Sequence, residues 1–213
     1  MGQTVEQFAQ GAVRGFLHTP DHSRGDGLLL THGAGANCAS PLLVAIANAF
    51  CSAGFWVLRF DLPFRQRRAF GPPHPSGAVE DRAGIQAALD CMRPLVSSRV
   101  FAGGHSYGGR QLSMLAAEKA RCCDAVLLLS YPLHPPKKPN DLRTTHFATL
   151  HSPTLFVHGT ADPFGTVEEM RRAVELIPAR KEFFFVDGAG HDLKRGKSEV
   201  AAQVLEAFLK FVG

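Results

Sequence analysis

The chain has 213 residues, of which 45% are hydrophobic and 20% are charged, and its formal net charge is +4. This balance suits one globular domain over residues 1–213 and argues against a disordered chain. The basic residues are mostly dispersed, so we do not expect nucleic acid as a partner. Five cysteines without a C-x-x-C pair argue against a disulfide framework and a zinc site, and we expect no metal or cofactor.

The amino-terminal residues lack the basic and apolar regions of a secretory signal. No apolar run approaches the ~18 residues that a membrane-spanning helix needs. We therefore expect a cytoplasmic protein that has no membrane partner.

Short apolar runs alternate with helical patterns along the chain. The predicted strands are residues 4–8, 13–17, 28–31, 55–60, 100–103, 125–129, 154–157 and 182–186. Helices are predicted between Ser40 and Gly54 and over 79–92, 110–118, 166–177 and 198–211, with a proline-rich loop at 62–77 and an irregular segment at 131–153.

The later strand runs are apolar throughout instead of alternating, which is typical of parallel strands buried on both faces. Their alternation with helices predicts a doubly wound, mostly parallel α/β sheet flanked by helices. A dinucleotide-binding domain of the same class would need G-x-G-x-x-G after an early strand. Cys38 stands where the last glycine of that motif would follow Gly33-Ala34-Gly35, so we set that alternative aside.

A G-x-S-x-G pentapeptide, Gly104-His105-Ser106-Tyr107-Gly108, directly follows one of the apolar strands. In a strand–turn–helix setting this pattern is a nucleophile elbow, which lifts a serine hydroxyl clear of the backbone. Glycines flank the serine because strand and helix come too close there for side chains. The pattern predicts Ser106 as a nucleophile.

An acid and a base follow two later strands. His158-Gly159-Thr160-Ala161-Asp162 comes after residues 154–157, and Asp187-Gly188-Ala189-Gly190-His191 comes after 182–186. Because sites in parallel sheets form beyond the carboxyl ends of strands, we expect Ser106, Asp162 and His191 to meet there as nucleophile, acid and base. Asp187 and Asp192 compete with Asp162 for the acidic role, and Asp192 could instead cap the following turn.

A hydrolytic serine also needs backbone N–H donors for the developing oxyanion. We expect one at Tyr107, which opens the helix after Ser106, and the other at Ala34, with Gly35 as the second choice. Gly33 and Gly35 then serve the loop that carries the donor, as Gly104 and Gly108 serve the elbow.

Taken together, these motifs resemble those of the α/β-hydrolase superfamily. The whole chain is similar to small dienelactone-hydrolase-like enzymes that lack a cap domain. It also resembles compact predicted hydrolases that share the His-Gly-Ala-Gly, Gly-x-Ser-x-Gly-Gly-Arg and His-Gly-Thr-x-Asp-Pro-Phe-Gly segments. Some eukaryotic relatives of that group occur as hydrolase-like domains in a chromatin-modifying complex. The resemblance implies an α/β-hydrolase fold.

Two loops are candidates for the substrate rim. The first carries the one basic cluster, with Arg65, Arg67 and Arg68 interleaved with phenylalanines. Such a cluster is either a solvated loop paired with nearby carboxylates or a recognition element for an anionic substrate. The second loop begins at Tyr131 and is rich in proline; it is too short for a helical lid, so we expect an open site.

The sequence therefore predicts a serine hydrolase that cleaves an ester, thioester or related acyl bond of a small-molecule substrate through an acyl-enzyme. The alternative is an interaction module that keeps the fold without catalysis. Three reactive residues at three separate strand ends argue against that alternative. A dehalogenase is disfavoured because its nucleophile would be an aspartate where Ser106 stands.

Overall fold

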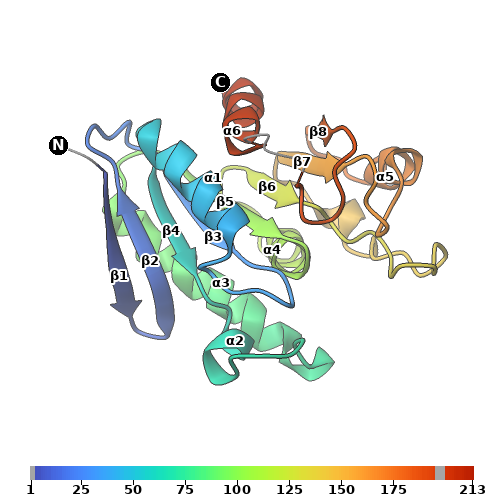
Figure 1. Cartoon of the computed structure of the whole chain (residues 1–213), viewed down its shortest axis with the longest axis horizontal. Coiled ribbons are helices and arrows are strands. Elements are labelled where there is room, and N and C mark those ends of the chain that lie inside the picture. Colours follow the sequence, from blue (N-terminus) through green and yellow to red (C-terminus); the bar gives the residue numbers. More distant parts are fainter. Residues whose placement is uncertain (1–2, 195–199) are drawn as a thin grey trace.

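The computed structural model describes residues 3–194 and 200–213, and an eight-stranded sheet runs through it in the order β1-β2-β4-β3-β5-β6-β7-β8 (Figure 1). The strands are β1 Thr4–Gln10, β2 Val13–Thr19, β3 Gly27–Thr31, β4 Trp56–Phe60, β5 Val100–His105, β6 Val126–Leu129, β7 Thr154–Gly159 and β8 Lys181–Val186. The helices are α1 Pro41–Ser52, α2 Pro63–Arg67, α3 Ala78–Met92, α4 Tyr107–Glu118, α5 Val167–Val174 and α6 Val200–Val212.

The strands from β3 to β8 pair in parallel, whereas β1 and β2 form an antiparallel hairpin that joins β4. Successive side chains of a strand point to opposite faces, so Leu28 and Leu30 of β3 pack with α1 and α6, and Leu29 packs with α3 and α4. Both faces are therefore covered by helices (Figure 1). The predicted doubly wound α/β fold class is confirmed.

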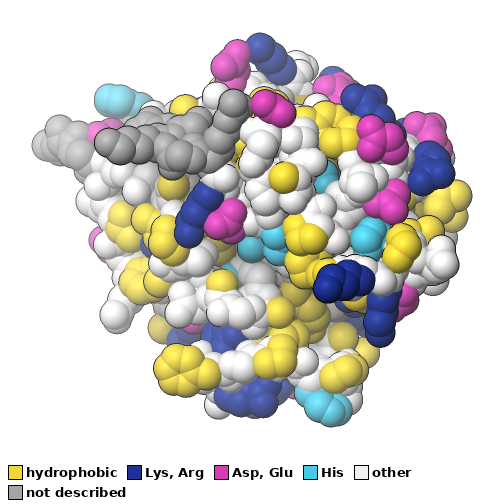
Figure 2. Space-filling model, turned by 45° about the vertical axis from the view of Figure 1, so that its right-hand side comes forward, with side chains coloured by type: hydrophobic (Ala, Val, Ile, Leu, Met, Phe, Trp, Pro, Cys, Tyr) yellow, Lys and Arg dark blue, Asp and Glu magenta, His cyan; other side chains and the backbone are white. Residues whose placement is uncertain are grey.

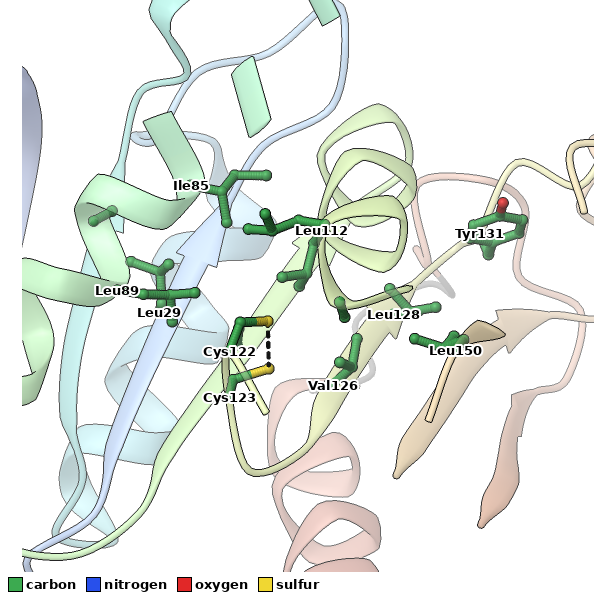
Figure 3. Packing of buried hydrophobic residues seen from close by; sticks show 14 of the residues in the cluster. Leu29, Ile85, Leu89, Leu112, Cys122, Cys123, Val126, Leu128, Tyr131 and Leu150 are labelled. Atoms are coloured by element: carbon green, nitrogen blue, oxygen red, sulfur yellow. Dashed lines mark hydrogen bonds between the residues drawn. The ribbon is translucent and has the colours of Figure 1, made fainter. Parts of the chain in front are cut away.

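The cluster on the α3–α4 face fills the space between the sheet and the helices (Figure 3). Figure 3 shows buried side chains of β3, α3 and α4 facing one another, among them Leu29, Ile85, Leu89 and Leu112. Close packing on both faces fixes the strands relative to one another, so their carboxyl ends form a rigid edge.

The proline-rich segment 62–77 is more ordered than predicted. It contains the short helix α2 and a 3₁₀ turn at Pro75–Gly77. Pro63 starts α2 with its fixed φ, and the backbone N–H of Phe64 donates to the buried carboxylate of Asp81 at 3.0 Å. Tertiary contacts of this kind give too weak a local signal to be predicted from composition.

Local capping signals agree with the structure elsewhere. At α5 the Thr166 side chain accepts from the Glu169 N–H, and the Glu169 carboxylate accepts from the Thr166 N–H, as the predicted capping box requires. The helix predicted over 198–211 is described from Val200, and residues 198 and 199 lie outside the described residues. Among the described residues no helix is long and apolar enough to cross a bilayer.

Candidate active site

Ser106 stands at the sharp turn between β5 and α4, with φ 51° and ψ −116°. A non-glycine residue rarely adopts these angles, and the surrounding packing holds them. A methyl group added at Gly104 would lie 2.5 Å from the Gly109 nitrogen, and one at Gly108 would lie 2.5 Å from the His32 oxygen. The Ser106 N–H donates to the Leu129 carbonyl at 2.9 Å. The segment therefore has the geometry of a nucleophile elbow.

Two hydrogen-bonding contacts link Ser106 to the other predicted site residues. Ser106 Oγ lies 2.7 Å from His191 Nε2, and His191 Nδ1 lies 2.8 Å from Asp162 Oδ2. The Asp162 side chain is fully buried, whereas the His191 side chain is 21% exposed. Residues 85 positions apart in the chain thus meet at the carboxyl ends of β5, β7 and β8.

The loop that carries His191 is fixed from several directions. The ring of Phe164 stacks on the His191 ring with centroids 4.1 Å apart. His105, on the strand before the elbow, contacts the His191 carbonyl through Nε2 at 2.9 Å. Burial lowers the pKa of His105, so the ring is neutral and its Nε2–H donates this bond. The imidazole of His191 is therefore held by packing and by its own backbone.

The structure separates the three candidate acids. Asp162 Oδ2 faces His191, and Asp162 Oδ1 accepts from the Phe164 N–H at 2.9 Å. Asp187 contacts the Thr160 hydroxyl, and Asp192 accepts from the Lys194 N–H in the following turn. Asp162 is therefore the acid whose contact with the His191 ring the structure shows.

The loop after β3 lies against the elbow on its other side. A methyl group added at Gly33 would be 3.4 Å from the Ser106 Cβ, whereas one at Gly35 would meet nothing within 4 Å. Neither the Ala34 N–H nor the Tyr107 N–H donates a hydrogen bond to another described residue. Both expected oxyanion donors are therefore available.

The His32 side chain fixes the loop that follows β3. Burial lowers the pKa of His32, so its neutral ring donates from Nδ1 to the Gly33 oxygen at 2.9 Å and accepts the Leu62 N–H at Nε2. The peptide group between Gly33 and Ala34 is thereby fixed in orientation. Sequence reasoning missed this role of His32, although the residue stands inside the His-Gly-Ala-Gly segment.

Arg65, predicted as a possible rim residue, is buried instead, with 6% of its surface exposed. All five of its N–H groups are used. They donate at 2.7 to 3.1 Å to the carbonyl oxygens of Ala34, Ala36, Arg68, Ala69 and Gly71. Arg65 therefore joins the loop after β3 to the segment after α2 and has no N–H group left for a substrate.

The other members of the basic cluster have local partners. Arg67 pairs with Glu80 of α3, and Arg68 donates to the Pro72 carbonyl. Tyr131, also predicted at the rim, is buried, and its hydroxyl donates to the Arg143 oxygen at 2.6 Å. The first interpretation of the cluster, a solvated loop paired with nearby carboxylates, fits Arg67. Arg65 and Tyr131 are buried instead, because the loops that carry them fold back on themselves.

Fold and elbow together define the α/β-hydrolase class: a mostly parallel sheet with a serine at a strained turn between a central strand and a helix. The chain belongs to the alpha/beta hydrolase domain family, whose model matches residues 24–209. This membership confirms the predicted resemblance to the α/β-hydrolase superfamily.

Solved structures of similar proteins cover nearly the whole chain. Dienelactone hydrolase from Anabaena variabilis superposes with a TM-score of 0.77 at 21% identity, over 99% of this chain and 98% of that one. XC6422 from Xanthomonas campestris, described as an α/β serine hydrolase without lid, has a TM-score of 0.75 at 13% identity, over 99% and 95%. At such identities the likeness shows the fold alone.

Among curated proteins, epoxide hydrolase A of Mycobacterium tuberculosis is 42% identical over 59 residues. The matched segment is 27% of this chain and 18% of that protein. The match therefore covers only a small part of the curated relative's length, and it agrees with the family assignment.

Proposed function

We propose that the protein is a serine hydrolase that cleaves an ester, thioester or related acyl bond through a covalent acyl-enzyme. The observation that carries this proposal is the pair of contacts joining Ser106 Oγ to His191 Nε2 at 2.7 Å and His191 Nδ1 to Asp162 Oδ2 at 2.8 Å. Membership in a hydrolase family supports it.

In the first step the Ser106 oxygen attacks the acyl carbon while its proton passes to His191 Nε2. Asp162 accepts the Nδ1–H, which keeps the correct tautomer and stabilises the imidazolium that forms. Because the Asp162 side chain is fully buried, its interaction with the imidazolium is weakly screened by solvent. Phe164, stacked on the ring, limits its rotation.

The tetrahedral intermediate carries negative charge on the former carbonyl oxygen. The N–H groups of Ala34 and Tyr107 are the proposed donors to that oxygen, and the first turn of α4 adds the positive end of its dipole. His32 and Arg65 orient the Ala34 side of this arrangement through the Gly33 and Ala34 carbonyls.

The intermediate collapses when His191 returns its proton to the leaving group, which leaves the acyl group on Ser106. A water molecule then attacks this ester, His191 accepts the water's proton, and the acid is released as Ser106 regains its hydrogen. Both half-reactions use the same base and the same oxyanion donors.

The nucleophile also discriminates between reaction classes. A serine that opened an epoxide or displaced a halide would be left as an ether, which has no carbonyl for water to attack. An acylated serine is an ester, which the same histidine can help to hydrolyse. The residue at the elbow therefore favours acyl substrates, even though the curated relative is named an epoxide hydrolase.

A fluorophosphonate probe tests the proposal because it reacts with activated serines. Wild type is expected to be labelled, whereas Ser106→Ala and His191→Ala are not; His151→Ala, at an exposed histidine, serves as the matched control. Thermal unfolding of each variant establishes that it is folded. If folded wild type is neither labelled nor active on 4-nitrophenyl butyrate, the proposal fails in favour of a non-catalytic interaction module.

A further inference from the structure

Arg110 lies one turn into α4, and its backbone N–H donates to the Ser106 carbonyl at 2.9 Å. Side chains of a helix lean toward its amino terminus, so the Arg110 guanidinium leans toward the edge where Ser106 stands. The residue is half-buried, and its Nε–H is fully buried without an acceptor among the described residues. A buried donor without a partner is costly and calls for a ligand or a role.

The other buried or half-buried arginines that the structure describes donate to acceptors inside the chain. Arg65 binds five carbonyls, Arg59 donates to His18, Arg82 pairs with Glu118, and Arg99 pairs with Asp26. Arg143 donates to the Pro132 oxygen at the long distance of 3.3 Å. Within the described residues, Arg110 is therefore the exception.

Arg143 belongs to the loop that follows β6, the strand next to β5. Its N–H donates to the Leu133 oxygen at 2.8 Å, and its own oxygen accepts the Tyr131 hydroxyl. These bonds hold Arg143 at the carboxyl end of β6, beside the strand that ends at Ser106. Burial and the nearby charge of Arg110 lower the pKa of Arg143, as expected for two guanidinium groups close together.

The neighbouring groups leave this pair without an ion-pair partner among the described residues, although the charge of Asp141 acts on Arg143 and raises its pKa against the effects of burial and Arg110. His146 contacts the Ser113 hydroxyl at 2.8 Å, and burial, Arg110 and Arg82 lower its pKa to about 4, so it is neutral at pH 7. Glu169 accepts from the Thr166 N–H at 2.7 Å, and no ion pair joins Arg110 or Arg143 to a described carboxylate. On the face drawn in Figure 2, histidine side chains reach the surface near the centre, and side chains of both charge signs lie around them.

We propose that Arg110 and Arg143 form an anion subsite beside Ser106 that selects acyl substrates carrying a carboxylate on the acyl chain; this inference rests on the proposed hydrolase function. Arg110 would donate from its open N–H edge to the carboxylate oxygens, and Arg143 would add a second positive charge. A guanidinium group with unpaired N–H donors can bind a single carboxylate group. Because the subsite adjoins the elbow, the carboxylate and the reacting carbonyl belong to the same short molecule.

Two esters of the same acyl length test this inference. The 4-nitrophenyl ester of glutaric acid with a free second carboxylate is compared with the same ester methylated on that carboxylate, after subtraction of the enzyme-free rates. Wild type is expected to prefer the anionic ester in kcat/KM. Arg110→Gln is expected to lower the anionic-to-neutral ratio by about 10- to 100-fold, and Arg143→Gln by a smaller factor. Arg180→Gln, at an exposed pair with Glu182, is the matched control.

A second measurement does not need turnover. Binding of glutaric acid monomethyl ester to Ser106→Ala is measured by calorimetry, with and without Arg110→Gln. Binding that disappears with Arg110→Gln supports the subsite, whether or not the protein hydrolyses the esters. Failure to hydrolyse either ester would overturn only the proposed function. Hydrolysis of both esters at a ratio that Arg110→Gln leaves unchanged, without calorimetric binding, overturns the subsite and leaves the proposed function standing.

Discussion

The loops on the two sides of Ser106 use their polar side chains in different ways. On the β7–β8 side, side chain meets side chain: His191 lies between Ser106 and Asp162. On the β3–α2 side, side chains hold backbone: His32 donates to the Gly33 carbonyl, and Arg65 donates to five carbonyls in two loops. One side supplies groups that can move protons, and the other fixes the direction of peptide N–H groups.

This difference tells apart two kinds of buried polar residue near one site. A residue whose partners are reactive side chains can be replaced with a large loss of activity and little loss of stability. A residue whose partners are carbonyl oxygens should affect stability first, because its removal leaves those oxygens buried without donors.

The largest effect is expected on the β7–β8 side. Ser106→Ala, His191→Ala and Asp162→Asn should each lower kcat/KM for a neutral ester by about 10³- to 10⁵-fold, because each removes part of the proposed proton relay. Their free energies of unfolding should stay within about 1 kcal/mol of wild type. Steady-state kinetics and urea unfolding measure the two quantities. If these variants lowered the free energy of unfolding by several kcal/mol as well, the two sides of Ser106 would not differ as described.

Arg65→Met tests the β3–α2 side. Five carbonyl oxygens would lose their donor, so we expect the free energy of unfolding to fall by about 3 kcal/mol and kcat to fall with it as the Ala34 N–H loses its orientation. Urea unfolding and ester kinetics are the measurements. Arg68→Met, at an exposed arginine, is the control and should change stability by less than about 0.5 kcal/mol. Equal effects of the two variants would contradict the assigned role of Arg65.

Tyr107→Phe sharpens the comparison because Tyr107, at the start of α4, combines a side chain that holds the fold with a backbone N–H of proposed catalytic role. Its hydroxyl donates to the buried Asp81 at 2.7 Å, while its backbone N–H is the proposed oxyanion donor. Removal of the hydroxyl should lower the free energy of unfolding by about 1 to 3 kcal/mol, and activity measured well below the unfolding temperature should remain close to that of wild type. A thousandfold loss of kcat in the folded variant would show that the side chain, and not the backbone, acts in catalysis.

The smallest effect is a dependence of stability on pH. Burial lowers the pKa of His18 and of His146 to about 4, with Arg59 adding to the effect at His18 and Arg110 and Arg82 at His146. The unfolded chain, with an ordinary histidine pKa near 6.5, therefore binds more protons between those values. Stability should be full above about pH 6.5 and should fall toward pH 4, by at most ~1.4 kcal/mol per pH unit for each histidine.

His146→Gln isolates one of these histidines. Unfolding in urea at a series of pH values between 7 and 4.5 should give a shallower decline for this variant than for wild type. His151→Gln, at an exposed histidine, should decline as wild type does. Identical slopes in all three proteins would mean that His146 does not stay neutral in the fold.

The sequence predicted the fold and the meeting of Ser106, Asp162 and His191 at one edge because both depend on strong local patterns. Ser106, Asp162 and His191 each follow an apolar strand, and parallel strands bring their carboxyl ends to one edge. The loops were predicted less well. A run of arginines does not reveal that Arg65 folds inward, since the carbonyls that bind it come from two separate segments.

The proposed binding role of Arg110 was not predicted from the sequence, although Arg110, unlike Arg65, stands inside a recognised motif. It stands in the motif Gly-x-Ser-x-Gly-Gly-Arg, so a signal was present, but its meaning depends on the absence of an acceptor around its Nε–H. Only three-dimensional packing of the described residues reveals that. Sequence patterns thus predict where the reactive side chains meet. The hydrogen bonds in the structure show which of the other buried polar side chains hold the fold.

The acyl-enzyme itself is the species that tests the proposed function most directly. Wild type is mixed with excess 4-nitrophenyl butyrate, quenched in acid within one turnover, digested and mapped by mass spectrometry. We expect the butyryl mass on the peptide that contains Ser106, and its absence in Ser106→Ala. The assignment of this serine as the nucleophile would be contradicted if wild type turned over the ester without an acyl group on Ser106 and the Ser106→Ala variant kept the same turnover.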